Sequence, residues 1–183
     1  MQGTVIRAAR VEDAAQIAVV HVRSWQSAYR GLLPQAYLDE LDPAQRVGRW
    51  ERYLTEVDGT TGTEVDGTTG GVLVAEDDRH LIGFISYSQS RDADADPKQV
   101  GEVGAIYLLS DAWRNGVGGR LMNAVLGRLA EAGFTEATLW VLDSNVRARR
   151  FYEAGGWSAD GALKSDESRG FPIMEVRYRK SLN

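Results

Sequence analysis

The sequence predicts an α/β domain with a largely antiparallel first half and a β-α-β unit in its second half. Two observations carry this prediction. Apolar runs of strand length follow one another between residues 71 and 109, and from residue 116 onward helical and extended segments alternate. The predicted order is β-α-α-β-β-β-α-β-α-β-β. The 183 residues suffice for one domain over 1–183 with a core of its own.

The first part of the chain is predicted to be one strand followed by helices. Apolar residues recur at helical spacing after Val11, and Gly31 and Pro34 interrupt the pattern. The expected elements are a strand over Thr4–Ala8, a helix over Val11–Tyr29 and a second helical region over Pro34–Leu54, interrupted around Asp42-Pro43.

The sequence TEVDGTTG occurs twice in succession, at 55–62 and 63–70. Two copies are too few for a repeat architecture, which needs at least about three stacked units. The Gly, Thr and Asp content is typical of a surface loop, so we expect a loop over 55–70. Calcium binding by the two Asp-Gly pairs is an alternative, although an EF-hand has a longer ligand set.

The second half of the chain begins with strands and continues with alternating helices and strands. The charged segment Arg91–Lys98 is expected to be a solvated loop. The expected elements are strands over Gly71–Glu76, Leu81–Ser88 and Val100–Leu109, a helix over Gly116–Ala132, a strand over Thr138–Leu142, a helix over Asn145–Ala154 and a last strand over Pro172–Tyr178.

Composition excludes several classes of site. The net charge of −5 disfavours binding to nucleic acid or to an anionic membrane. Without cysteine there is no disulfide, thiolate nucleophile or Cys-ligated metal, and the two histidines are too few for a histidine-rich metal site. No apolar run has the length of a membrane span or the form of a signal peptide. We therefore expect a cytoplasmic protein without a metal.

A glycine-rich turn lies between the strand that contains Glu102 and the helix that follows. Gly116, Gly118 and Gly119 let a phosphate approach backbone N–H groups at the positive end of the helix dipole. The Walker A sequence is absent, and the third glycine of a dinucleotide fingerprint is missing. Two interpretations of this turn remain: a pyrophosphate loop for an acyl-CoA, or a glycine-rich turn without a ligand.

A second motif occupies the segment from Leu139 to Trp157. Asn145 and Tyr152 fall on one helix face, whereas Phe151 and Trp157 are expected in the core. An Asn at a helix start can bind an amide chain, and a Tyr hydroxyl can act as an acid. Alternatively, Asn145 is only a helix cap and Tyr152 a packed aromatic.

Together, the two motifs resemble the acetyl-CoA motifs of the GNAT superfamily of N-acetyltransferases. Its Q/R-x-x-G-x-G/A signature is similar to Trp113-Arg114-Asn115-Gly116-Val117-Gly118, with Trp113 in the Gln/Arg position. Its N-x-x-A-x-x-F-Y-x-x-x-G-F/W pattern is matched by Asn145, Ala148, Phe151, Tyr152, Gly156 and Trp157. The resemblance implies a mixed, mostly antiparallel central sheet flanked by helices.

The resemblance also implies how acetyl-CoA, the co-substrate, is bound. The pantetheine arm is expected along the backbone of Ile106, Tyr107 and Leu108 and at Asn145, with Tyr152 near the thioester sulfur. The pyrophosphate is expected on the amides of the loop, which comprises Arg114, Asn115, Gly116, Val117, Gly118 and Gly119.

The expected reaction is direct acetyl transfer to a primary amine. An alkylammonium with a pKa near ~10 must lose a proton before it attacks a thioester. Glu102 is the candidate base, because the family often has an acid there, and Tyr152 is the candidate acid for the departing thiolate. An exposed strand carboxylate is the alternative for Glu102.

Trp25 and Tyr29, four residues apart, belong to helices that in the family usually line the acceptor pocket. They either form an aromatic box for a cation or fix their helix to the sheet. The expected acceptor is a small-molecule amine. A protein N-terminus or lysine, and a non-catalytic acetyl-CoA-binding regulatory module, are the alternatives. GNAT-like proteins are often dimers, so a homodimer is possible.

Overall fold

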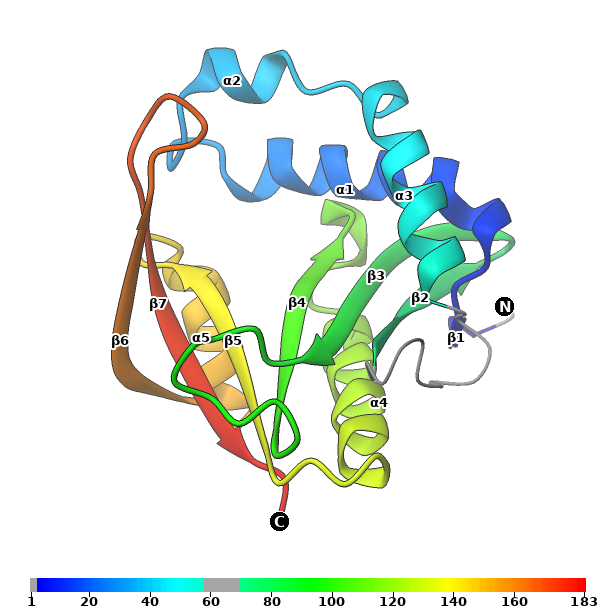
Figure 1. The fold of residues 1–183 in the computed structure, drawn as a ribbon. Coiled ribbons are helices and arrows are strands. Elements are labelled where there is room, and N and C mark those ends of the chain that lie inside the picture. The colour runs from blue at the N-terminus through cyan, green and yellow to red at the C-terminus, as the bar shows by residue number, and fades with distance from the viewer. Residues whose placement is uncertain (1–2, 58–69) are drawn as a thin grey trace.

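The structure, a computed structural model, describes residues 3–57 and 70–183. Figure 1 shows the helices arranged on both faces of a central sheet. In chain order, with η for a short 3-10 helix, the elements are β1 Val5–Ala8, η1 Val11–Asp13, α1 Ala14–Ala28, α2 Gln35–Asp39, α3 Ala44–Glu56, β2 Gly70–Asp77, β3 His80–Gln89, β4 Val100–Leu108, η2 Ser110–Ala112, α4 Val117–Glu131, β5 Glu136–Leu142, α5 Val146–Ala154, β6 Ser158–Asp166 and β7 Ile173–Ser181.

The strands form one sheet in the order β1-β2-β3-β4-β5-β7-β6. Every pair of neighbours is antiparallel except β4 and β5, which are parallel and joined by α4. The predicted fold class and order are confirmed. The second helical region divides at Asp42-Pro43 into α2 and α3, as expected, because proline disfavours continuation of a helix.

The predicted loop over 55–70 is wrong at its two ends. Thr55 and Glu56 belong to the last turn of α3, where the Thr55 hydroxyl donates a hydrogen bond to the Glu51 carbonyl at 2.8 Å. Gly70 begins β2 and pairs with Ser88 of β3. The rest of the duplicated segment, 58–69, lies outside the described residues.

Two apolar cores hold helices on opposite faces of the sheet. On β2, Leu73 packs with α4 through Leu121 and Val125. Val72 and Val74 alternate with Leu73 and pack with α1 and α3 on the other face. Around β2, the sheet is therefore covered by helices on both faces.

The sheet has an opening between β4 and β5. The two strands pair only over Val100–Val103 and Glu136–Leu139. A bulge at Gly104, where β4 has one residue more than β3, bends β4 away from β5. β5 meanwhile stays paired with β7 up to Leu142. The strands consequently diverge from a shared end, as Figure 1 shows.

Among the described residues, no helix is both long enough and apolar enough to cross a membrane.

Candidate active site

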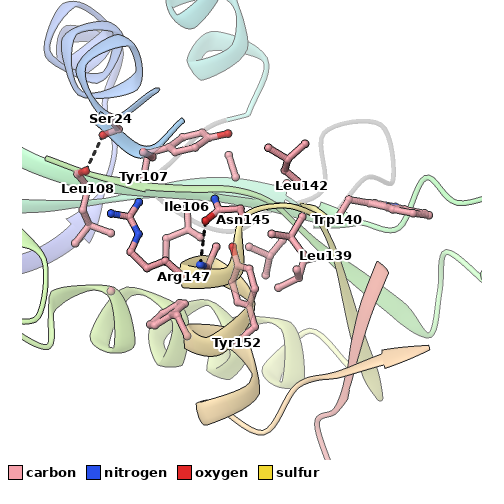
Figure 2. Close-up of a pocket in the computed structure, with 18 of the residues that line it drawn as sticks. Ser24, Ile106, Tyr107, Leu108, Leu139, Trp140, Leu142, Asn145, Arg147 and Tyr152 are labelled. Carbon is pink, nitrogen blue, oxygen red and sulfur yellow. Dashed lines mark hydrogen bonds between the residues drawn. The ribbon is translucent and has the colours of Figure 1, made fainter. Parts of the chain in front are cut away.

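A cavity of about 870 Å³ lies where β4 and β5 diverge. Its walls come from α1, β4, the turn before α4, β5, α5 and the β6–β7 pair, so the cavity connects the two faces of the sheet. Figure 2 shows Ile106 and Tyr107 on one wall, Leu139 to Leu142 on the other, and Asn145, Arg147 and Tyr152 entering from α5.

The wall on β4 has main-chain groups without a strand partner on the β5 side, from Gly104 onward. Ile106, Tyr107 and Leu108, predicted to hold the pantetheine arm, all line the cavity. The Leu108 carbonyl is already bound within the chain, because the Ser24 hydroxyl donates to it at 2.8 Å and Trp113 Nε1 at 3.1 Å. These two bonds tie α1 and the glycine-rich turn to the end of β4.

The glycine-rich turn is shaped for an anion. Arg114 and Gly116 both have left-handed backbones, with φ of 63° and 76°, and Gly116 is the N-cap of α4. Such turns direct successive N–H groups toward one point, here at the positive end of a helix of fifteen residues. Of the predicted loop residues, Arg114, Gly116, Gly118 and Gly119 line the cavity. Asn115 instead donates a hydrogen bond to the Asp111 carbonyl, and Val117, the first residue of α4, is buried in the core.

Asn145 and Tyr152 both line the cavity from α5. Asn145 is the helix N-cap, with Oδ1 accepting from the Ala148 amide at 3.2 Å. The cap uses only the carbonyl oxygen, so the side-chain amide remains a donor for a pantetheine carbonyl, and the two interpretations are compatible. Burial raises the pKa of Tyr152 well above 10, and the nearby Tyr107 adds to the shift. Its hydroxyl is therefore protonated at neutral pH.

Two residues of this wall were missed or misassigned from the sequence. Phe151 was expected in the core, but its side chain is 38% exposed and lines the cavity, whereas Trp157 is buried as expected. Arg147 was not predicted at all. Its guanidinium lies 3.6 Å from the ring centroid of Trp113, the residue in the Gln/Arg position of the signature. Arg147 thus places a cation at the end of the cavity where the phosphates of acetyl-CoA are expected.

The Acetyltransferase (GNAT) family model matches residues 24–157. This chain belongs to the GNAT family. GNAT members use acetyl-CoA as co-substrate, and the protein is an acetyl-CoA-dependent N-acetyltransferase. Two relatives are similar over most of their length. The N-acetyltransferase YuaI of Bacillus subtilis is 31% identical over 81% of this chain and 77% of its own. An N-acetyltransferase of Archaeoglobus fulgidus is 32% identical over 90% and 96%.

Solved structures share the GNAT fold at lower identity. The PaiA N-acetyltransferase of Thermoplasma acidophilum, crystallised with coenzyme A, has a TM-score of 0.69 and 20% identity over 98% of this chain and 99% of its own. Salmonella typhimurium yncA, solved with acetyl-CoA, has a TM-score of 0.69 and 16% identity over 100% and 95%.

In this GNAT domain, Glu102 lies on β4 with Tyr107, facing α1, and lines the cavity. It is buried rather than an exposed strand carboxylate. Arg91 holds both of its oxygens, with Nη2 at 2.7 Å from Oε1 and the main-chain N–H at 3.1 Å from Oε2. An incoming amine must therefore share this carboxylate with a guanidinium.

The two aromatic residues predicted to contact the acceptor differ in position. Tyr29 lines the cavity. Trp25 packs behind Tyr29, with a centroid distance of 5.0 Å, and does not reach the cavity wall. Arg46 and Arg169 already lie 5.9 and 5.7 Å from the Trp25 ring. Because Tyr29 lines the cavity and Trp25 does not, Tyr29 is the member of the pair that can meet an acceptor.

The segment Arg91–Lys98 is a largely exposed loop, as predicted, but it is also tied to the sheet by ion pairs that the sequence did not reveal. Asp92 and Asp94 pair with the buried Arg177 of β7 at 3.1 and 2.7 Å. Asp92 also accepts a hydrogen bond from Trp140 Nε1 at 3.0 Å. These bonds hold the loop against β5 and β7 beside the cavity.

His21 of α1 packs against the sheet, with its ring stacked on that of Tyr107 at a centroid distance of 5.3 Å. Burial, together with the charges of Arg46 and Arg49, lowers the pKa of His21 to about 3. Between pH 3 and 6.5 the unfolded chain thus binds a proton that the native state does not, so stability falls as the pH falls through this window. We expect His21 to lower the free energy of unfolding by up to about 2 kcal/mol as the pH falls from 6.5 to 5.

Urea unfolding of His21→Phe at both pH values tests this expectation. The variant keeps an aromatic ring, and the difference in unfolding free energy between the two pH values should shrink. His80→Gln, which changes the exposed histidine at the start of β3, is the control. An unchanged difference in His21→Phe would show that His21 is protonated in the native state.

Proposed function

We propose that this GNAT enzyme transfers the acetyl group of acetyl-CoA directly to the primary amine of a small molecule. One observation carries the proposal. A single cavity joins the N-terminus of α4 to the α1 face of the sheet, and Glu102 and Tyr152 both lie on its wall. The chain contains no cysteine that could form an acyl-enzyme, which supports direct transfer.

Binding of the co-substrate would use three parts of the cavity. The main-chain N–H groups from Arg114 to Gly119 donate hydrogen bonds to the pyrophosphate, and Arg147 lies beside the same turn, at Trp113. The free main chain of β4 and the Asn145 amide bind the pantetheine arm. Acetyl-CoA supplies an activated acyl group, and β4 directs it toward the α1 face, where Glu102 lies.

Glu102 and Tyr152 would have separate roles in the reaction. Glu102 accepts the proton that the ammonium must lose before its nitrogen can attack. Main-chain N–H groups near the Gly104 bulge polarise the thioester carbonyl. As the C–N bond forms and the C–S bond breaks, the Tyr152 hydroxyl donates a hydrogen bond to the sulfur, on which negative charge develops. The second proton that the nitrogen loses on becoming an amide goes to the departing thiolate, which is released as the free thiol of coenzyme A.

The acceptor end of the cavity favours a small molecule over a polypeptide. The segment between β6 and β7 reaches over to α2, where Phe171 contacts Tyr37 at a centroid distance of 5.0 Å. Leu142 and Ile173 pack with Leu38 in the same cluster. Figure 1 shows the segment between β6 and β7 close to α2. A contact at this place leaves less room for a peptide acceptor than for a small molecule.

Release of free thiol from acetyl-CoA, measured against polyamines, amino acids, aminoglycosides and short peptides, tests the proposal. Release that depends on one class of small amine is expected. Release with peptides alone would replace the small-molecule acceptor with a protein. Tight acetyl-CoA binding without release by any amine would instead favour a regulatory module.

Glu102→Gln should lower kcat/KM at pH 7 by about ten- to a hundredfold, because the ammonium then loses its proton acceptor. Part of the loss should be recovered as the pH approaches the pKa of the amine, where free amine becomes abundant. A pH profile of both proteins measures this recovery.

Arg91→Met is the matched control, because it breaks the same ion pair and leaves the carboxylate in place. It should keep a rate at or above that of the wild type. Equal losses in the two variants would mean that the ion pair matters for structure and that Glu102 is not the base.

A further inference from the structure

An amine of the chain itself already lies in the cavity. Lys164 of β6 lines the wall, with its Nζ 3.5 Å from a carboxylate oxygen of Glu175 on β7. The same Nζ lies 4.9 Å from the ring centroid of Trp140 on β5. An alkylammonium group between a carboxylate and an aromatic face is the arrangement by which proteins bind cationic amines.

The aromatic part of this arrangement is fixed in place. Trp140 Nε1 donates to Asp92, and Asp92 pairs with the buried Arg177, which also contacts Asp94 and Asp160. The ring therefore cannot turn away without breaking a hydrogen bond to a carboxylate that is itself held by an ion pair. The Trp140 face is a prepared platform rather than an adaptable side chain.

The cationic part, in contrast, is held weakly. The 3.5 Å between Lys164 and Glu175 exceeds the usual N–H···O distance, and the lysine side chain is 50% exposed. Such pairs contribute little to stability, so another cation can replace the lysine at small cost.

Glu175 is also the more accessible of the two carboxylates that line the cavity. The Glu102 side chain is only 7% exposed and both of its oxygens are bound by Arg91, whereas the Glu175 side chain is 27% exposed. Glu175 lines the same cavity as Tyr29 and Tyr107. Burial is the largest cause of the raised pKa of both hydroxyls, and the Glu175 charge adds to it.

We propose that Glu175 and the face of Trp140 form the subsite that binds the ammonium group of the acceptor, and that Lys164 occupies this subsite until the acceptor displaces it. The proposal rests on the proposed function and deepens it. The acceptor reaches the enzyme as an alkylammonium at Glu175, and its proton is removed at Glu102 on the same face of the sheet.

n-Butylamine is the matched probe, since its structure is that of a lysine side chain. Glu175→Gln should raise the KM for n-butylamine by about ten- to a hundredfold, the effect of losing a charged hydrogen-bond partner, and leave kcat close to the wild-type value. Lys164→Ala should lower this KM, because the competing cation is gone. Lys98→Ala, which changes an exposed lysine of the loop before β4, should change neither constant.

The KM for n-butylamine should rise in Glu175→Gln and fall in Lys164→Ala. This difference in direction distinguishes a subsite from a structural role, since loss of structure would raise KM in both variants. An unchanged KM in Glu175→Gln, a fall in kcat alone, or a KM in Lys164→Ala that is unchanged or higher would each overturn the subsite, while turnover by the wild type would still support the proposed function. If the wild type acetylates no amine, calorimetric titration with n-butylammonium decides. Binding that is lost in Glu175→Gln keeps the subsite, and absence of binding overturns it.

Discussion

Tyr152→Phe is expected to lower kcat by about a hundredfold or more and to leave the affinity for acetyl-CoA nearly unchanged. The ring fills the same space within the core around α5, so only the hydroxyl is lost. The hydroxyl matters because the thiolate is a charged leaving group and Tyr152 is the donor expected beside the sulfur. Thiol release under saturating acetyl-CoA measures the effect.

The direction of the pKa shift defines what Tyr152 can do. Burial keeps the hydroxyl protonated, but an alkyl thiol titrates near ~8.5, so full transfer of a proton from a tyrosine with a raised pKa is unfavourable. The hydrogen bond to sulfur, which strengthens as charge develops, supplies the stabilisation. Because the pKa is raised, the wild-type rate should not fall up to about pH 10 through loss of this proton.

Tyr87→Phe is the matched control, because it removes a hydroxyl from a buried tyrosine of the same core that does not line the cavity. It should keep the wild-type kcat. A Tyr152→Phe enzyme as fast as the wild type would mean that Tyr152 is only a packed aromatic and that the thiolate leaves without a donor.

The parts of the site that sequence could predict are those built by a single local element. Asn145 and Tyr152 share a helix face by spacing alone, and the structure brings both to the cavity. The glycine-rich turn is likewise local, because the strand, the turn and the helix follow one another without interruption.

The acceptor subsite could not be predicted, because it depends on which strands become neighbours. Trp140, Lys164 and Glu175 meet only because β7 lies between β5 and β6, with Lys164 opposite Glu175 and Trp140 opposite Arg177. Each residue alone has the sequence context of an ordinary strand residue. Pairing order and register, which bring them together, are not properties of any one segment.

Two features that the sequence did not reveal have the same origin. The loop Arg91–Lys98 is largely exposed, as its composition predicts, but its ion-pair partner Arg177 lies 83 positions after Asp94. Phe151 is an apolar residue in a helix, and apolar residues are usually buried. It lines the cavity because α5 forms part of the cavity wall, a position that only the assembled sheet defines.

Gly119→Glu is expected to raise the Kd for acetyl-CoA by a hundredfold or more. Gly119 lines the cavity in the first turn of α4, and a Cβ there meets nothing within 4 Å. A carboxylate at this position therefore has room in the free protein, yet lies beside the expected pyrophosphate. Like charges about 4 Å apart at a protein surface repel by roughly 4 kcal/mol, enough for such a loss of affinity.

The same substitution should not destabilise the protein, and this makes the result interpretable. Glutamate favours helix more than glycine does, and an acid in the first turn interacts well with the helix dipole, so Tm should stay equal or rise. Gly127→Glu, eight residues further along the same helix, is exposed, equally free of contacts and carries the same change in charge, but does not line the cavity. Calorimetry should show wild-type affinity in Gly127→Glu and weak binding in Gly119→Glu. Equal affinities in the two variants would mean that the phosphates do not bind at the N-terminus of α4.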